Sequence, residues 1–366
     1  MILDGSLPES VAAAARALRG GALLGLPTET VYGLAADADN ASAVHRIFEA
    51  KGRPSDHPLI VHLAPGDGAQ GWRAGVDHYA REVPAFAQAL MQAFWPGPLT
   101  LILPRREGVA AVSAGGQDSV GLRCPSHPVA QALLTAACAH GVHGVAAPSA
   151  NRFGRVSPTT AAHVVDEFAG VPDDELLVLD GGACPVGIES TIVDATRGEP
   201  VLLRPGMITA QTLSQACGLP VRERDAQAPR VSGSLVSHYA PQARVRLADA
   251  LALSEALRAE PEPTRVAVYA QAGVAELHQG ADAVFTDSKG HRTESPDRRQ
   301  AHNHVDDTED NAGETLNNIK DELTFFTQTV QGKTEQNSKQ QHLQNITAGK
   351  RPHQRHRCRQ QRPAHL

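Results

Sequence analysis

The sequence predicts an α/β protein, and three observations indicate this class. Short, nearly continuous apolar segments recur along the first 206 residues, patterns with helical periodicity lie between them, and proline and glycine mark many of the boundaries. Continuous apolar segments are typical of strands in a sheet that is covered on at least one face. Strands that alternate with helices then favour the α/β class.

The expected elements follow from these patterns. Residues 11–18 are expected to form an alanine-rich helix that Pro8 opens and the pair Gly20-Gly21 ends. Further helices are expected over residues 41–50, 83–94, 127–140, 159–169 and 207–219. Strands are expected over residues 22–26, 59–63, 99–103, 120–122, 145–147, 176–179 and 191–193.

Composition divides the chain into four predicted parts. Residues 1–206 are the main α/β domain, and residues 207–241 hold one helix and a linker rich in proline, serine, glycine and charge. Residues 242–287 are typical of the opening of a second, smaller α/β domain. Its expected elements are helical segments at 247–257 and 270–277 and strands at 265–269 and 283–285.

Residues 288–366 differ in composition, with 23 Asn, Gln or His but only ten large apolar residues among 79. Such a segment cannot bury enough apolar surface to offset chain entropy, so we expect a disordered, low-complexity tail. Two explanations are open. The reading frame departs near 286–290 and leaves the second domain truncated, or a natural basic tail contacts RNA. Composition favours the first, and the frame in close relatives tests it.

Charge and cysteine content limit the function classes. The net charge is −6, and residues 1–287 carry 21 Lys and Arg against 30 Asp and Glu. A protein that depends on non-specific phosphate contacts is expected to be basic, so any cationic surface here must be local. Five scattered cysteines without CxxC spacing argue against a zinc or disulfide framework. We see neither a membrane span nor a signal peptide, so a cytoplasmic location is expected.

Two short polar motifs, Lys51-Gly-Arg53 and Ser149-Ala-Asn151, each follow an apolar run and lie beside a proline. Residues two apart in an extended segment point the same way, so each motif is expected to present its side chains together. Two cations opposite a hydroxyl and an amide can hold a polyanion such as a triphosphate. On spacing alone, such motifs are more often a solvated basic turn and an unrelated turn with an N-cap serine than a polyanion site.

An ordered series of further segments changes that balance. The segments are Leu26-Pro-Thr-Glu-Thr-Val-Tyr-Gly-Leu34, Lys51-Gly-Arg-Pro-Ser-Asp-His-Pro-Leu-Ile-Val-His62, Phe94-Trp-Pro-Gly-Pro-Leu-Thr-Leu101, Val120-Gly-Leu-Arg-Cys-Pro125, Ala147-Pro-Ser-Ala-Asn-Arg-Phe-Gly-Arg-Val-Ser-Pro158, Gly187-Ile-Glu-Ser-Thr-Ile-Val-Asp194 and Leu203-Arg-Pro-Gly206. In this order and spacing, residues 8–206 resemble the YrdC-like family of threonylcarbamoyl-AMP synthases. Residues 232–241 resemble the linker of its longer, two-domain members.

The resemblance implies a twisted, mixed sheet with a concave face and a nucleotidyltransferase activity. The implied reaction joins L-threonine, bicarbonate or CO2, and ATP into threonylcarbamoyl-AMP and pyrophosphate. The product would pass to the tRNA threonylcarbamoyl transferase machinery that forms threonylcarbamoyladenosine. Because all three substrates bring negative charge, the site must supply cations and fixed N–H dipoles.

The resemblance also implies residue roles. The candidate catalytic residues are Lys51, Arg53, Ser149 and Asn151. The candidate ATP contacts are Arg53, His57, Ser119, Ser149, Ser157, Arg204 and Tyr239. The candidate threonine contacts are Thr30, His62, Arg123, the backbone around Ala147, and Ser190.

Several of these residues also have plain structural readings. Ser157 can be a helix N-cap instead of a phosphate contact. Arg123 can be half of a structural salt bridge. Glu29 and Glu189 are candidate general bases for the threonine ammonium, but a carboxylate beside an arginine is more often its ion-pair partner.

Nucleotide and metal motifs are absent from the sequence. Neither a GxxxxGK[ST] P-loop nor GxGxxG spacing occurs, so neither a P-loop nor a dinucleotide fold is expected to hold ATP. No Asp/Glu cluster marks a metal site. Mg²⁺ usually keeps its waters and binds phosphates, so we expect it to arrive on ATP without dedicated protein ligands.

Two alternatives remain. Hydrogenase-maturation carbamoyltransferases contain a similar module but also carry paired CxxC zinc motifs, which this chain lacks. A non-catalytic module of the same fold that binds double-stranded RNA or tRNA is the second alternative, and the acidic body weakens it. Pyrophosphate release in the presence of threonine, bicarbonate and ATP distinguishes the enzyme from the binding module.

Overall fold

The computed structural model describes residues 1–68, 70–172 and 175–233, residues 252 and 255, and two later strands. The chain forms two compact units, Met1–Arg244 and Val245–Leu366. The predicted tail at 288–366, the candidate Tyr239 and the predicted helical segment at 270–277 lie almost wholly outside the described residues. The four-part domain division stays a prediction.

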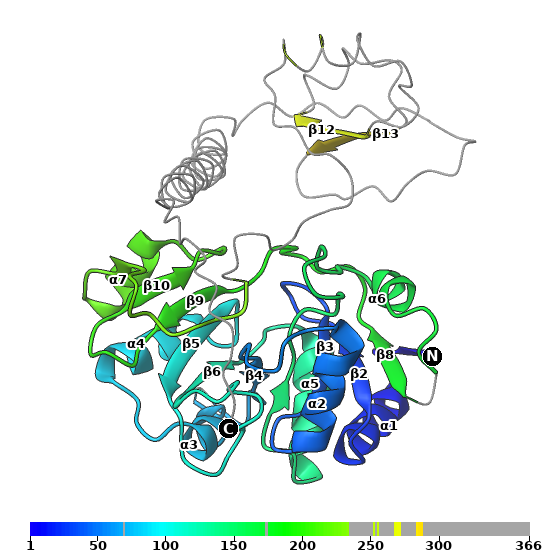
Figure 1. The fold of residues 1–366 in the computed structure, drawn as a ribbon, viewed down its shortest axis with the longest axis horizontal. Helices are drawn as coiled ribbons and strands as arrows, with labels where there is room; N and C mark the ends of the chain where they lie inside the picture. Colours follow the sequence, from blue (N-terminus) through cyan, green and yellow to red (C-terminus); the bar gives the residue numbers. More distant parts are fainter. Residues whose placement is uncertain are drawn as a thin grey trace, which may run out of the picture. The chain divides into compact units, whose positions relative to one another are not determined.

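The first unit is built on one mixed sheet, as the resemblance implies (Figure 1). Its strands are β1 (Ile2–Asp4), β2 (Leu23–Leu26), β3 (Gly33–Asp37), β4 (Ile60–His62), β5 (Leu99–Pro104), β6 (Ser119–Arg123), β7 (Val145–Ala146), β8 (Leu176–Asp180), β9 (Thr191–Asp194), β10 (Val201–Arg204) and β11 (Arg222–Glu223). They lie in the order β1-β8-β2-β3-β7-β4-β6-β5-β9-β10-β11. Both parallel pairs, such as β4 with β6, and antiparallel pairs, such as β5 with β6, occur.

Seven helices accompany these strands in the described part of the first unit. They are α1 (Pro8–Arg19), α2 (Ala41–Lys51), α3 (Arg73–Tyr79), α4 (Ala85–Phe94), α5 (Pro128–Ala139), α6 (Ala161–Glu167) and α7 (Ala210–Cys217). The expected helices are present with small shifts at their ends, and α3 was not expected. No helix in the described part of the chain is long and apolar enough to cross a membrane.

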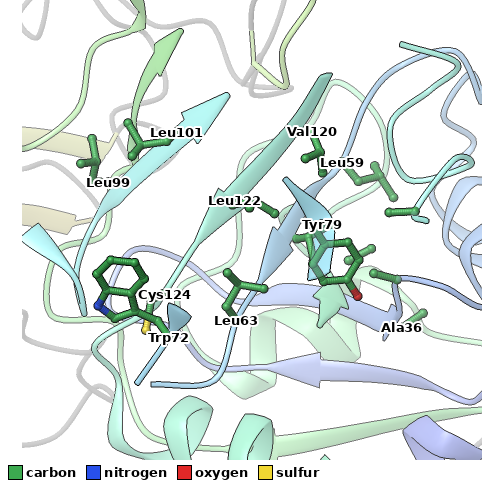
Figure 2. Packing of buried hydrophobic residues seen from close by; sticks show 14 of the residues in the cluster. Ala36, Leu59, Leu63, Trp72, Tyr79, Leu99, Leu101, Val120, Leu122 and Cys124 are labelled. Carbon is green, nitrogen blue, oxygen red and sulfur yellow. The ribbon is translucent and has the colours of Figure 1, made fainter. Parts of the chain in front are cut away.

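The two faces of the sheet are covered differently. Neighbouring residues of one strand face opposite sides, so Leu23 joins one apolar cluster and Leu24 joins another. The larger cluster packs α2, α3, α4, α6 and α7 on one face, and Figure 2 shows some of its side chains, including Trp72 and Tyr79. The second cluster packs α1 and α5 on the opposite face.

The rest of that second face carries a third, smaller cluster. It contains strand residues such as Ile60, Ile102 and Ile192 together with Val231, and no helical side chain of the described residues joins it. The strands beneath it are β4, β5, β6, β9 and β10. This part of the sheet is therefore available for a site.

Four strands of the first unit were not expected. In β3 the sequence Gly-Leu-Ala-Ala-Asp has little β propensity, yet all five residues are buried between β2 and β7. The strands β1 and β10 also went unpredicted. β11 lies inside the predicted linker and pairs in parallel with β10. Residues 222 and 223 of the predicted linker therefore belong to the first unit's sheet.

The second unit is described as two strands, β12 (Ala267–Gln271) and β13 (Ala283–Asp287), and at residues 252 and 255, which are helical and lie within the helix expected at 247–257. They pair in parallel, with Ala267 opposite Ala283. The sequence placed strands at 265–269 and 283–285, so each prediction overlaps an observed strand.

Candidate functional site

Lys51 is the last residue of α2, and the local sequence explains why the helix ends there. Asn40 caps the start by accepting a hydrogen bond from the Ala43 amide at 3.1 Å. At the other end, Gly52 is left-handed, with φ of 61°, which glycine adopts without steric cost. The expectation that Lys51-Gly-Arg53 is an extended segment is therefore wrong, because the helix continues through Lys51.

The Lys51 ammonium reaches the bend that contains Ser149 and Asn151. It donates to the carbonyl oxygen of Ser149 at 2.5 Å and to that of Asn151. Its side chain is buried, and this burial, together with the Arg53 cation, lowers the pKa of the ammonium to about 7. An ammonium has three N–H donors, so one remains for a further acceptor.

The Ser149–Asn151 bend is fastened to β3. Gly33 and Ser149 form a bridge, and the Ala150 amide donates to the Tyr32 carbonyl at 2.8 Å. The side-chain amide of Asn151 donates to the main-chain carbonyls of Arg152 and Arg155 at 2.8 and 2.9 Å. The sequence predicted that the two side chains face the cations together. Instead, the main-chain carbonyls of the bend meet Lys51, and the Asn151 side chain braces its own turn.

Arg53 is buried and lies beside Ser232. Its guanidinium donates to the Pro58 carbonyl at 2.9 Å and to the Ser232 hydroxyl at 3.4 Å. His57 lies nearby with its ring edge against Phe153, 5.5 Å between centroids. Partial burial and the Arg53 cation lower the pKa of His57.

Arg123 ends β6 directly beside His62, the last residue of the neighbouring strand β4. Its guanidinium contacts the Glu29 carboxylate at 2.7 Å, the Thr30 hydroxyl at 2.9 Å and the Gly97 carbonyl at 3.3 Å. These contacts use three of the five N–H groups of an arginine. Two N–H groups are left, which suits a bidentate contact with a carboxylate.

Glu29 is the ion-pair partner of Arg123. Burial acts to raise the pKa of the Glu29 carboxyl, but the Arg123 charge, its hydrogen bonds and the Ser126 amide at 3.1 Å more than offset burial, and the pKa is lowered. A carboxylate with a lowered pKa is a weak base. Of the two readings that the sequence left open for Glu29, the ion pair is therefore the one with geometric support.

His62 is buried beside this pair. Burial, reinforced by the Arg123 charge, lowers the pKa of His62 to about 3, so its imidazole is neutral near pH 7. A neutral imidazole offers one donor and one acceptor to a neighbour.

A small hollow, which we call the Arg123 hollow, collects most of the candidate threonine residues. Its lining is Thr28, Thr30, Val31, Gly33, Ile60, His62, Arg123, Ala147, Pro148, Ser149, Glu189 and Ser232. Of the predicted threonine contacts, Ser190 is outside this lining. Of the predicted catalytic residues, Ser149 lines it, whereas Lys51, Arg53 and Asn151 do not.

Ser190 instead lies with Arg204, on the β9–β10 side of the hollow. Arg204 donates to the Ser190 carbonyl and hydroxyl, both at 3.0 Å, and the Ser190 hydroxyl lies 2.8 Å from that of Thr100. Arg204 also contacts the Glu189 carboxylate at 3.5 Å. This network fixes Arg204 beside the Arg123 hollow through Glu189.

Ser157 donates to the same Glu189 carboxylate at 2.9 Å. It does not cap a helix, because α6 begins four residues later, at Ala161, and Thr160 accepts the capping bond from the His163 amide at 3.3 Å. The N-cap reading of Ser157 is therefore wrong, and Glu189 becomes the contact of both Ser157 and Arg204.

A second hollow adjoins the first and contains Ser119, the remaining described nucleotide candidate. The two hollows share Ile60 and Ser232. Ser232 also places its hydroxyl on Arg53 and its carbonyl on Arg204, at 3.4 and 3.1 Å. Sequence reasoning assigned Ser232 only to a linker, since a serine beside glycine carries no signal of contact with residues far away in the chain.

Metal-binding clusters were also sought. Among the described residues, no group of three or more His, Cys, Asp or Glu side chains lies close enough together to hold a metal ion. The expectation that Mg²⁺ arrives on ATP stays a prediction.

Comparison with known proteins gives consistent matches. Residues 16–206 match the Sua5/YciO/YrdC family model, described as telomere recombination, and residues 208–344 match a model described as the C-terminal domain of threonylcarbamoyl-AMP synthase. The second match continues beyond residue 288, where the composition changes. Because the first match covers more than half of the chain, the protein belongs to the Sua5/YciO/YrdC family.

Individual relatives agree with that assignment. Threonylcarbamoyl-AMP synthases of Pyrococcus abyssi and Bacillus subtilis are 42% and 40% identical over 237 and 245 residues. These alignments cover 63% and 65% of this chain but 66% of each relative, slightly under two thirds of its length. The crystal structure of P. abyssi Sua5 complexed with L-threonine is similar with a TM-score of 0.66 and 36% identity, covering 78% of this chain and 82% of that one.

Proposed function

We propose that this protein is a nucleotidyltransferase that makes L-threonylcarbamoyl-AMP from L-threonine, bicarbonate or CO2, and ATP, with release of pyrophosphate. The observation that carries the proposal is the pairing of two cation sites. A carboxylate-paired arginine lies in one hollow, and a buried lysine that makes no ion pair with any described residue contacts a bend of the same hollow. The threonine complex of the P. abyssi relative supports the assignment of one substrate.

Threonine would bind in the Arg123 hollow. Its carboxylate suits the two remaining N–H groups of Arg123, which Glu29 and Gly97 hold in a fixed orientation. Neutral His62 and Thr30 add polar groups without net charge. Such a combination favours a small zwitterion that carries a hydroxyl group over an apolar amino acid.

ATP would bind with its phosphates towards Lys51, Arg53 and Ser149. The last N–H of Lys51 and the Arg53 guanidinium supply positive charge from a buried, weakly screened position. Arg204, Ser119, His57 and Ser157 are the further nucleotide contacts that we propose. Tyr239 remains part of the proposal and lies outside the described residues.

The reaction balances as two bond-forming steps. The threonine nitrogen attacks the carbon of CO2 and loses a proton, which gives a carbamate. A carbamate oxygen then bonds to the α-phosphorus of ATP while the bond to pyrophosphate breaks. The second step joins two anions, the carbamate and ATP, so holding them in place between fixed cations is the main contribution that we assign to the protein. Mg²⁺ would come with ATP.

The downstream assignments belong to the same proposal. The product would pass to the tRNA threonylcarbamoyl transferase machinery, in the cytoplasm, with tRNA or RNA contact as a further possibility for this chain. Direct hand-over matters because a mixed carbamic–phosphoric anhydride is readily attacked by water.

The test is a pyrophosphate-release assay with the full chain, ATP, Mg²⁺, bicarbonate and threonine. We expect release that requires threonine and bicarbonate together, with threonylcarbamoyl-AMP as the coupled product. Serine and valine are the matched amino-acid controls, since each lacks one feature of the threonine side chain. Retention of tRNA without pyrophosphate release would contradict the proposed enzymatic activity and favour the RNA-binding alternative.

A further inference from the structure

A cavity of about 200 Å³ lies between α3, α4 and the segment after β5, and it shares no lining residue with the two hollows described above. Its floor is apolar, since Trp72, Val76, Ala80 and Met91 are all buried in the main core cluster. Figure 1 shows α3 and α4 near one end of the sheet's helical layer. An apolar floor with an open polar rim is the general form of a small-molecule site.

Three arginines and two carboxylates line the rim. Arg73 is partly neutralised by Asp77, 3.8 Å away on the same helix. Arg106 is held in place because it donates to the Asp77 carbonyl at 2.8 Å. Arg81 makes no side-chain hydrogen bond or ion pair with any of the described residues, and Glu82 is the second carboxylate.

The lining therefore has a net charge of +1, and this charge selects the ligand. A cation would meet three guanidinium groups, and an uncharged apolar molecule would make no charged contact with Arg81 or Arg106 at the rim. A phosphate dianion would exceed the charge that the cavity offers. A carboxylate with a short apolar body matches both the charge and the apolar floor.

We propose that this cavity, which we call the α3–α4 pocket, binds a small amphiphilic carboxylate. The apolar body lies on Trp72 and Met91, and the carboxylate meets Arg81 and Arg106. This site goes beyond the proposed function, because none of its residues takes part in the proposed chemistry.

The test measures hexanoate binding to the full chain by tryptophan fluorescence and by calorimetry. The sequence has two tryptophans, Trp72 in the pocket floor and Trp95, whose ring packs against Trp72 at 5.4 Å between centroids. A ligand in the pocket should therefore change the emission of both. We expect saturable hexanoate binding. Hexanol, which lacks the carboxylate, and acetate, which lacks the apolar chain, should bind at least about fivefold more weakly.

Arg81→Gln separates this pocket from the Arg123 hollow, which could also accept a carboxylate. We expect Arg81→Gln to weaken hexanoate binding about fivefold, the scale of an exposed ion pair. Arg16→Gln on α1, which makes the same charge change on an exposed helix, should leave binding unaltered. Because Arg81 is exposed, the variant is expected to fold. Undetectable binding, equal binding of hexanol, or equal binding by Arg81→Gln would overturn the proposal.

Discussion

Arg123 and Lys51 are both buried cations, but they are held in opposite ways. Arg123 lines the Arg123 hollow, whereas Lys51 contacts the bend at Ser149 that borders it. Arg123 is paired with a carboxylate at 2.7 Å, and its charge is neutralised inside the protein. Lys51 is held by two main-chain carbonyls, with another cation nearby, and burial lowers its pKa to about 7. A paired arginine is ready to orient a ligand. The carboxylates of Glu189 and Glu167 offset the burial of Lys51 only in part, so a bound anion would add a favourable charge interaction.

This difference indicates a division of labour. The Arg123 side is rigid before any substrate binds, because Glu29, Thr30 and Gly97 each fix part of the guanidinium. On the Lys51 side, burial and the Arg53 cation disfavour the charged ammonium, and a bound phosphate group would stabilise it. The predictions below test the comparison, from the largest expected effect to the smallest.

The largest effect is expected for Glu29→Ala. Removing this carboxylate leaves the Arg123 charge buried and uncompensated, which costs about 3–5 kcal/mol of the free energy of unfolding. Urea unfolding followed by tryptophan fluorescence measures this cost in the first unit, which contains both tryptophans. Asp77→Ala breaks the exposed pair with Arg73 and should cost about 1 kcal/mol or less. Equal losses of stability in the two variants would show that the buried Arg123–Glu29 pair is held no differently from an exposed ion pair.

Lys51→Met or Arg53→Ala should lower turnover at least ~100-fold, the scale for removing one charge-stabilising donor. Lys51→Met should lower the free energy of unfolding by about 1–3 kcal/mol, since methionine cannot donate to the carbonyl groups of Ser149 and Asn151 that the ammonium now satisfies. Steady-state pyrophosphate release together with urea unfolding checks both statements. A wild-type rate in Lys51→Met would reject the role of this lysine.

ATP binding should take up a proton above pH 7. The free Lys51 ammonium has its pKa lowered from 10.5 to about 7, so at pH 8 it is mostly neutral. A bound phosphate favours the charged form and raises that pKa, so binding at pH 8 adds close to one proton, and binding at pH 6 adds little from this group. Calorimetry in buffers of different ionisation enthalpy measures the uptake. Identical uptake in Lys51→Met would show that the proton goes elsewhere.

The smallest effect is expected for Ser232→Gly. This change removes the 3.4 Å hydroxyl contact with Arg53 but keeps the carbonyl that accepts from Arg204. A hydrogen bond of this length is worth less than about 1 kcal/mol, so the KM for ATP should change by no more than about fivefold. A change near that of Arg53→Ala would mean that Ser232 itself orients the nucleotide.

The sequence predicted strands from runs of large apolar residues, and β3 has no such run. The strand β10 was missed although Val201-Leu-Leu203 is apolar. The buried strand β3 is made of small residues, and only its neighbours β2 and β7 give it extended pairing partners. Local pattern reading cannot supply that information, because the stabilising contacts come from elsewhere in the chain.

The same limit applies to the site. The motifs correctly indicated that Lys51 approaches the Ser149–Asn151 bend, although the contact is made by carbonyl groups. Gly52 ends the helix directly after Lys51, one residue later than the sequence reading placed its end. Ser232 lies 179 residues from Arg53 in sequence, so only the fold could bring them together.

The most direct test of the two-cation account is a crystal structure with a non-hydrolysable ATP analogue and threonine. The account predicts phosphate oxygens on Lys51 and Arg53, the threonine carboxylate on Arg123, and the threonine nitrogen facing the α-phosphorus across the Arg123 hollow. Phosphates bound away from Lys51 and Arg53, or a threonine that leaves Arg123 uncontacted, would contradict it.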